Sequence, residues 1–184
     1  MGLQNNLVIL DSHNLEWQKI FKSEKLILKS IFDDSAVRIE HVGSTAINGI
    51  SAKPIIDIAV GVKTLNLSKS IIKRLEEAGY IKIQGHGDVD RIFFAKGSRE
   101  NRTHHLHVEL YNGISWNNHI LFRDYLNSNK EKIIEYETLK KELAAKYYND
   151  RDKYTLGKAS FIISVIEMCK REKENRNVNK SSVL

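Results

Sequence analysis

Residues 39–62 read IEHVGSTAINGISAKPIIDIAVGV, and this stretch decides the fold. It predicts a strand that ends at Gly43-Ser44, a short helical turn, and a second strand over residues 54–62. The second strand is apolar almost throughout, which is typical of a central strand with both faces buried. Asp57 interrupts that apolar run. Because unpaired burial of a carboxylate is costly, its side chain must be paired, hydrated or bound to a metal ion.

The turn between the two strands has the residue types of a phosphate-binding loop. Gly43 allows the backbone to approach another group closely. Ser44 and Thr45 can cap a helix whose free N–H groups face outward, which suits a phosphate. Phosphate donors beside a carboxylate that can hold Mg²⁺ are the minimum of a nucleotide site. The loop is not a P-loop, because residues 43–53 lack the G-K-[ST] ending. The alternative is an ordinary strand-to-helix turn, where glycine and serine are common.

The periodicity of the remaining chain predicts an α+β protein. Helices are expected over residues 15–32, 67–78, 115–127, 131–148 and 153–170, and strands over 37–42, 80–84, 91–95 and 105–111. Strands followed by a run of helices indicate a mixed sheet with helices packed against it. We expect one domain over residues 1–170, with a core over 15–112 and C-terminal helices over 115–170. A basic, flexible tail is expected over 171–184.

Composition narrows the class of protein. The chain has 184 residues, a net charge of +6 and a single cysteine, Cys169, which fits a reducing cytoplasm. It contains no apolar run of the roughly 18 residues that a membrane span needs. Residues 170–184 hold five basic and two acidic residues, so much of the excess charge lies in the tail. Basic residues are not interleaved with aromatic ones, which argues against nucleic-acid binding. From the single cysteine and the lack of a spanning run we expect a cytoplasmic protein without membrane binding.

A strand rich in histidine is the second candidate for chemistry. Strand alternation places His105, His107 and Glu109 on one face. Two imidazoles and a carboxylate on one face can bind a metal ion or exchange protons. If this strand neighbours the strand of Asp57, one of the three can complete a metal site. The alternative is a polar sheet face whose histidines are hydrogen-bonded beneath helices.

Four segments in order carry a resemblance to a known family. Together with residues 39–62, the segments RTHHLHVEL (102–110), NHILFRDYL (118–126) and DKYTLGKASFI (152–162) resemble motifs of the GrpB (UPF0157) family. The resemblance covers residues 16–166. It implies the nucleotidyltransferase-like superfamily, whose mixed β-sheet core is packed by helices, here with a C-terminal helical segment.

The resemblance also implies roles for particular residues. Gly43-Ser44 would hold a triphosphate, and Asp57 would be the primary ligand of Mg²⁺ or Mn²⁺. The superfamily usually has a second acid two residues after the first, where this chain has Ala59. A two-metal mechanism needs several carboxylates, so this departure weighs against it. Glu40 and His41 also match the family motif. One interpretation is that they hydrogen-bond across to the histidine strand, where a structural role is as open as a chemical one.

The candidate site residues fall into three overlapping groups. The catalytic candidates are Asp57, His105 and His107. The metal candidates are Asp57, His107 and Glu109. The nucleotide-binding candidates are Gly43, Ser44, Thr45, Lys53, Arg102, Arg123, Tyr154 and Lys158.

The assignment of Arg123 has a structural alternative, and a neighbouring glycine supports that of Lys158. Arg123 can instead form an ion pair with Asp124 on a helix surface. Gly157, beside Lys158, costs about 1 kcal/mol relative to alanine inside a helix, which indicates close packing or the approach of a ligand.

Three functions are compatible with the sequence. The leading hypothesis is a metal-dependent nucleotidyltransferase-like protein. It would use a nucleoside triphosphate and transfer a nucleotidyl or phosphoryl group to an unknown small-molecule or protein acceptor. The second is a catalytically degenerate binding or accessory module, because the family's domain also occurs fused to dephospho-CoA kinase. The third is a metal-dependent hydrolase that uses His41, His105, His107 and Asp57.

Overall fold

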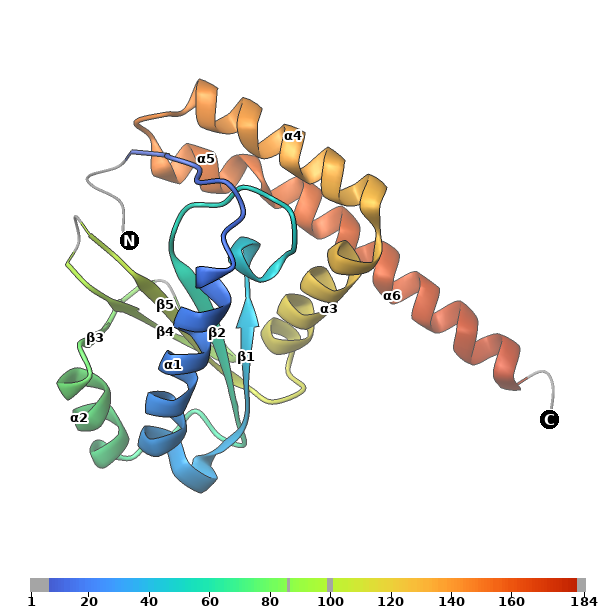
Figure 1. Cartoon of the computed structure of the whole chain (residues 1–184). Coiled ribbons are helices and arrows are strands. Elements are labelled where there is room, and N and C mark those ends of the chain that lie inside the picture. The colour runs from blue at the N-terminus through green and yellow to red at the C-terminus, as the bar shows by residue number, and fades with distance from the viewer. Residues whose placement is uncertain (1–6, 86, 99–100, 182–184) are drawn as a thin grey trace.

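The computed structural model describes residues 7–85, 87–98 and 101–181. A five-stranded sheet lies at its centre, in the order β1-β2-β5-β4-β3 (Figure 1). The strands are β1 (Ala36–Val42), β2 (Ile56–Val62), β3 (Tyr80–Lys82), β4 (Arg91–Lys96) and β5 (His104–Leu110). Only β2 and β5 are parallel, and the other neighbouring strands are antiparallel. The expected α+β class with a mixed sheet is confirmed.

Apolar residues of β2 and β5 form the main core on one face of the sheet. Ile56, Ile58 and Val60 alternate toward this face together with Leu106 and Val108. Helices α1 (Glu16–Phe32) and α2 (Lys69–Glu77) cover it, as Figure 1 shows. The opposite face must then carry the alternate residues, among them Asp57 and the polar residues of β5.

The C-terminal helices form a second core that meets the opposite face. They are α3 (Ile114–Ser128), α4 (Lys130–Lys146), α5 (Arg151–Gly157) and α6 (Ala159–Ser181). Their apolar residues pack around Ile47 and Ile50 from the loop that follows the short 3₁₀ helix η2 (Ser44–Ala46). Another 3₁₀ helix, η1 (Asp33–Ser35), joins α1 to β1. The loop before β2 is thus clamped between the sheet and the C-terminal helices.

One expected helix is two helices in the structure. The segment predicted as a helix over 153–170 is divided at Lys158 into α5 and α6. A Cβ atom on Gly157 would lie 2.5 Å from Cδ2 of Leu143 on α4, so the glycine allows α5 to pack closely against α4. The backbone of α6 is helical to Ser181, inside the segment 171–184 expected to be a tail. The flexibility of that tail stays a prediction.

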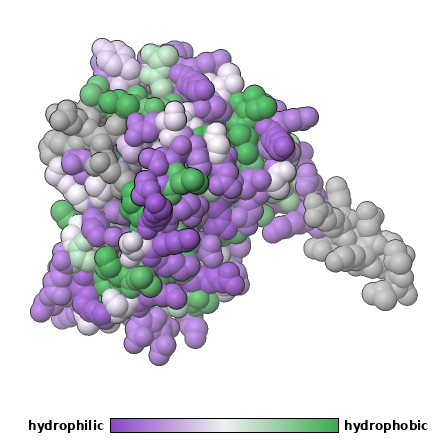
Figure 2. All heavy atoms as spheres, viewed as in Figure 1, coloured by the Kyte–Doolittle hydropathy of each residue, from purple (hydrophilic) through white to green (hydrophobic). Residues whose placement is uncertain are grey.

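The surface seen in Figure 2 is mostly hydrophilic, with hydrophobic residues in small, separate groups. Among the described residues, none of the helices combines the length and the apolar character that a bilayer crossing requires.

Candidate functional site

Asp57 lies at the junction of β2 and β5, which are neighbouring parallel strands. The register pairs Asp57 with His105 and Ala59 with His107. Oδ1 of Asp57 lies 3.0 Å from Nδ1 of His105 and 3.4 Å from Nε2 of His107, and both are hydrogen-bond contacts. In an ionised state the carboxylate accepts both bonds, so each histidine presents a protonated nitrogen to it. The histidine strand is thus a neighbour of the strand of Asp57, which was the condition for a shared site.

Position 43 requires glycine because it lies so close to the carboxylate of Asp57. Its φ is 69°, a region that favours glycine, and it directly precedes η2. A Cβ atom at this position would lie 2.5 Å from Oδ2 of Asp57. The backbone of the turn therefore passes directly beside the carboxylate, and only glycine leaves enough space.

Burial and hydrogen bonding keep Asp57 ionised and His107 neutral. Burial alone would raise the pKa of Asp57, but the hydrogen bonds from His105 and His107 outweigh it and hold the pKa well below its usual value. Burial lowers the pKa of His107 to about 4, although the hydrogen bond to Asp57 opposes this shift. Near neutral pH, Asp57 is thus ionised and His107 is neutral.

A cleft of about 900 Å³ opens beside Asp57. The sheet forms one wall, and α5 with the start of α6 forms the other. Basic side chains dominate its polar lining. They are Lys53, Arg91, Arg102, Arg151, Lys153 and Lys158, against the acids Asp57 and Asp152.

Two lysines share one aromatic ring in this cleft. Nζ of Lys53 lies 5.2 Å, and Nζ of Lys158 4.5 Å, from the ring centroid of Tyr154. Burial, then repulsion by Lys158 and Arg151, lowers the pKa of Lys53 to about 7. Burial likewise lowers the pKa of Lys158 to about 8, although Asp57 opposes the shift. The cleft therefore holds ammonium groups at a cost in free energy, which a bound anion would reduce.

Most of the candidate residues come together in this cleft. Its lining includes the following eight: Ser44, Lys53, Asp57, Arg102, His105, His107, Tyr154 and Lys158. Arg91, Phe93 and Arg151 also line it and were missed from the sequence. Arg91 and Phe93 pair with Glu109 and His107 across β4 and β5, so strand alternation would have found them once that pairing was known. Nη2 of Arg151 lies 3.4 Å from Nε2 of His105.

Thr45 does not face the cleft. Its side chain is buried, and its Oγ1 lies 2.9 Å from Nε2 of His41 and donates to the carbonyl of Ile55. The expectation that His41 bonds to the histidine strand is wrong, because β1 pairs with β2 and not with β5. The ring of His41 stacks instead on Phe21 of α1. The four-residue hydrolase set that included His41 is therefore not assembled.

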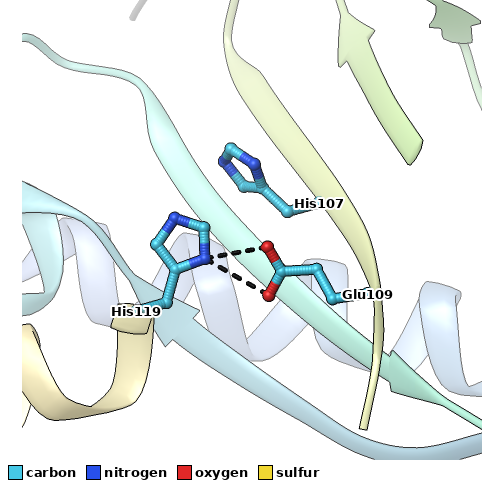
Figure 3. A group of neighbouring side chains, drawn as sticks. All are labelled: His107, Glu109 and His119. Atoms are coloured by element: carbon cyan, nitrogen blue, oxygen red, sulfur yellow. Dashed lines mark hydrogen bonds and ion pairs between the residues drawn. The ribbon is translucent and has the colours of Figure 1, made fainter. Parts of the chain in front are cut away.

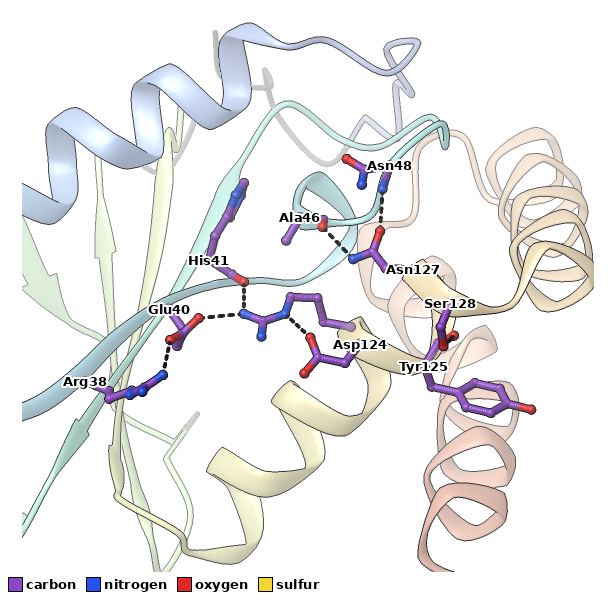
Figure 4. A network of polar contacts seen from close by, with 10 residues as sticks. Arg38, Glu40, His41, Ala46, Asn48, Asp124, Tyr125, Asn127 and Ser128 are labelled. Carbon is purple, nitrogen blue, oxygen red and sulfur yellow. Dashed lines mark hydrogen bonds and ion pairs between the residues drawn. The ribbon is translucent and has the colours of Figure 1, made fainter. Parts of the chain in front are cut away.

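Arg123 also lies outside the cleft lining, and this corrects its assignment to the nucleotide. It donates to Oε2 of Glu40 and to the carbonyl of His41, each at 2.9 Å, and to Asp124 at 2.8 Å (Figure 4). These contacts join α3 to the end of β1. The ion pair with Asp124 expected as the alternative is present, and Glu40 is engaged there rather than with the histidine strand. Arg123 therefore positions elements and has no contact with the cleft.

Glu109 is separated from Asp57. It pairs with Gly61 in the register, is fully buried, and lies beside His119 of α3. Within the described residues, the only potential metal-binding group of three or more His, Cys, Asp and Glu side chains is His107, Glu109 and His119 (Figure 3). The predicted metal ligands Asp57, His107 and Glu109 therefore do not form one group. His107 contacts Asp57 on one side and is grouped with Glu109 on the other.

Comparison with known proteins places the chain in a family. A family model described as GrpB protein matches residues 7–168. The chain belongs to the GrpB family. It is 45% identical over 170 residues to glutamate-rich protein GrpB of Alkalihalophilus pseudofirmus, covering 90% of this chain and 98% of that one. A crystal structure of conserved protein GrpB from Enterococcus faecalis matches with a TM-score of 0.82 and 31% identity, over 90% of this chain and 99% of the other.

A more distant match concerns the fold alone. The Cid1 poly(U) polymerase crystal structure matches with a TM-score of 0.50 and 14% identity, over 74% of this chain and 43% of Cid1. At that identity the likeness concerns the fold, which is nucleotidyltransferase-like.

The GrpB-family chain offers ligands for one cation at Asp57 but not for a pair. Mg²⁺ is commonly held by one or two carboxylates together with substrate phosphates and water, which suits Asp57 at the edge of the cleft. Ala59 is fully buried and packs with Val42 and Trp116, so its position supplies no second ligand. The residues present therefore fit a single divalent ion.

Proposed function

We propose that this GrpB-family chain binds a nucleoside triphosphate in the cleft, with one divalent cation at Asp57, and transfers a nucleotidyl or phosphoryl group to an acceptor. The observation that carries the proposal is the charge of the cleft. Six basic side chains line it against two acids, and Lys53 and Lys158 both have lowered pKa values there. Such a cleft favours a compact polyanion.

The residues have distinct roles in this proposal. The first N–H groups of η2 have no partner inside the helix, so the turn at Ser44 can donate to a phosphate. Lys53, Lys158 and Arg151 would balance the remaining phosphate charge, and Arg151 suits bidentate contacts. Tyr154 is almost fully buried and orients the two ammonium groups. A divalent ion at Asp57 would neutralise charge on the phosphates.

His105 is the proposed general base. Asp57 accepts a hydrogen bond from Nδ1, which leaves the lone pair of Nε2 available at the cleft. A base oriented in this way by a carboxylate can take a proton from an acceptor hydroxyl. The hydrogen bond from Arg151 to Nε2 would have to open when the acceptor enters.

Thermal-shift titration with the four NTPs, with and without Mg²⁺ or Mn²⁺, tests binding. A ligand at 100 times its dissociation constant adds about 2.7 kcal/mol of stability, or about 5–10 °C for a chain of this size. Asp57→Asn should abolish the metal-dependent part, and Lys158→Ala should weaken binding of every NTP. Lys22→Ala removes an exposed lysine on α1 and should change nothing. Absence of a shift in wild type at millimolar NTP would refute the proposal.

Ala59 favours a second candidate, a module that binds a nucleotide without turning it over. Its buried position beneath Trp116 supplies no second carboxylate. Release of pyrophosphate or of nucleoside diphosphate, measured with metal ions and candidate acceptors, separates the two functions. Binding that depends on Asp57 without any release would favour the module.

A further inference from the structure

A second group of possible ligands lies behind the cleft, between β5 and α3. Ligand atoms of His107, Glu109 and His119 all lie within 4.8 Å of one another. Figure 3 shows the imidazole of His119 facing the carboxylate of Glu109, with the ring of His107 beside them. The ring centroids of the histidines are 4.8 Å apart. Nδ1 of His119 lies 2.9 Å from Oε1 of Glu109 and hydrogen-bonds to Oε2 at 3.2 Å.

The polar atoms of this group are incompletely satisfied. Within the described part of the chain, Nδ1 of His107 is buried without a hydrogen-bond partner. Oε1 of Glu109 is also buried, and although it lies 2.9 Å from Nδ1 of His119 it accepts no well-aligned hydrogen bond. Both have a lone pair to share when His107 is neutral. Buried polar atoms without partners are rare and costly in native proteins, so two of them in one group indicate a missing partner. A cation would satisfy both atoms, as would a water molecule that donates to both, whereas another acceptor would not.

His107 is arranged as histidine ligands of metal ions usually are. Its Nε2 is hydrogen-bonded to the carboxylate of Asp57. A ligating histidine almost always donates its other N–H to a carboxylate, a carbonyl or water, which fixes the tautomer and the ring orientation. With the proton on Nε2, the nitrogen left for a cation is Nδ1, the atom that has no partner.

We propose that His107, Glu109 and His119 form a binding site for a divalent transition-metal ion of the Zn²⁺ type, distinct from the nucleotide-associated cation at Asp57. Two imidazoles and one carboxylate are a known ligand set of Zn²⁺ and leave its fourth position open. Mg²⁺ and Ca²⁺ prefer all-oxygen ligands and would be rejected. In a tetrahedral zinc site with bonds of about 2.1 Å, two ligand atoms lie about 3.4 Å apart. The ligand atoms here lie within 4.8 Å of one another, so the group must close when the ion binds. His119, whose side chain is 27% exposed, has room to move.

The bound ion would hold His107 rigidly and with it the hydrogen bond to Asp57. The proposed site thus supports the cleft from behind without entering it. Its loss should leave the basic lining of the cleft unchanged.

Zinc titration of the metal-stripped full chain, without nucleotide, tests this site. We expect one Zn²⁺ per chain, read by a competing chelator dye, and visible d–d absorption of a low-coordinate ion when Co²⁺ replaces it. His119→Ala should weaken Zn²⁺ binding at least tenfold. Mg²⁺ at millimolar concentration should not compete with Zn²⁺.

Control variants decide between this site and incidental binding. His13→Ala removes a histidine that contacts Trp17 edge-to-face and is outside the proposed ligand set, and this variant should bind Zn²⁺ as wild type does. Glu109→Gln keeps the size of the buried side chain and should also lose binding. His119→Gln replaces His119→Ala if the alanine variant does not fold. No zinc uptake by wild type, unchanged uptake by the His119 variant, or equal loss in His13→Ala would overturn the proposal.

Discussion

Among single residues, Gly43 controls the site most directly, because its backbone touches the carboxylate of Asp57. In Gly43→Ala the new Cβ would lie 2.5 Å from Oδ2 and the backbone would keep a φ of 69°. With ψ at −172°, this backbone lies in a region that glycine occupies almost alone, and a non-glycine residue costs about 1–3 kcal/mol there. We therefore expect a loss of about 2–4 kcal/mol in the free energy of unfolding, measured by denaturant titration. Binding of NTP and metal should weaken at least tenfold, because Asp57 is displaced.

Gly49→Ala is the matched control for this prediction. Gly49 has a φ of 80°, but a Cβ there would meet nothing within 4 Å. It should lose about 1–2 kcal/mol from backbone strain alone and keep its affinity for NTP. Equal effects of the two variants on affinity would show that contact with Asp57 is not what makes Gly43 necessary.

The pKa values of the cleft lysines predict a pH dependence of binding. Lys53 loses its proton as pH rises through about 7, and Lys158 as it rises through about 8. A polyphosphate binds the protonated forms, so its affinity should fall between roughly pH 6 and 9, with proton uptake on binding. Calorimetry in buffers of different ionisation enthalpy measures both. The free energy of unfolding should rise over the same range, because the unfolded lysines stay protonated to near 10.5.

The variant Lys53→Arg tests whether deprotonation of Lys53 causes the pH dependence of NTP affinity. A guanidinium stays protonated throughout this range, so the variant should bind NTP with a shallower pH dependence than wild type. An affinity of wild type that does not change with pH would mean that neither lysine contacts the bound phosphates.

Between elements, α3 holds the phosphate turn in place through two polar side chains. Arg123 bonds to Glu40 and the carbonyl of His41 at the end of β1. Asn127 donates to the carbonyl of Ala46 and accepts from the backbone of Asn48 (Figure 4). Neither residue touches the cleft, yet together they fix the loop that places Gly43 beside Asp57.

Arg123→Ala should therefore affect stability rather than binding chemistry. Hydrogen bonds to charged groups contribute about 1.5–3 kcal/mol, and partial exposure reduces this, so we expect a loss of about 1–3 kcal/mol in unfolding free energy. The folded variant should keep its NTP affinity within about twofold. Arg38→Ala is the control, because its side chain is 63% exposed and its ion pair with Glu40 is 3.5 Å long. A large loss of affinity in Arg123→Ala would restore Arg123 to the binding site.

Some features of the helices and strands can be predicted from the sequence, and others cannot. Period-2 and period-3.6 patterns reveal that β2 is buried and that helices follow β5, because each pattern is local. Alternation likewise places His105 and His107 on one face, and the sequence needs only the parallel pairing with β2 to bring them to Asp57. The orientation of the Thr45 side chain and the position of Arg123 depend on which elements pack together, so no local sequence pattern predicts them. The division between α5 and α6 at Lys158 is also missed for this reason. The sequence around Gly157 fits one continuous helix, whereas the contact of Gly157 with Leu143 joins residues far apart in the chain.

In the whole molecule, the cleft joins two distant parts of the chain. Residues from β2, β4 and β5 form one wall, and Arg151, Tyr154 and Lys158 in and beside α5 form the other. The lining of the cleft as a whole has six basic and two acidic side chains, so an anion between the walls would reduce the repulsion among its cations. A bound triphosphate would contact both walls and suppress local opening of α5.

Hydrogen–deuterium exchange measures that effect. With saturating MgATP, or the NTP that gives the largest thermal shift, amide exchange in α5 should slow several-fold. Exchange in α2, which packs on the opposite face of the sheet, should not change. Asp57→Asn should show the protection of α5 only in part, because the lysines still attract the phosphates while the cation site is lost. Protection spread evenly over the chain would indicate global stabilisation instead, and binding without protection of α5 would place the nucleotide against the sheet alone.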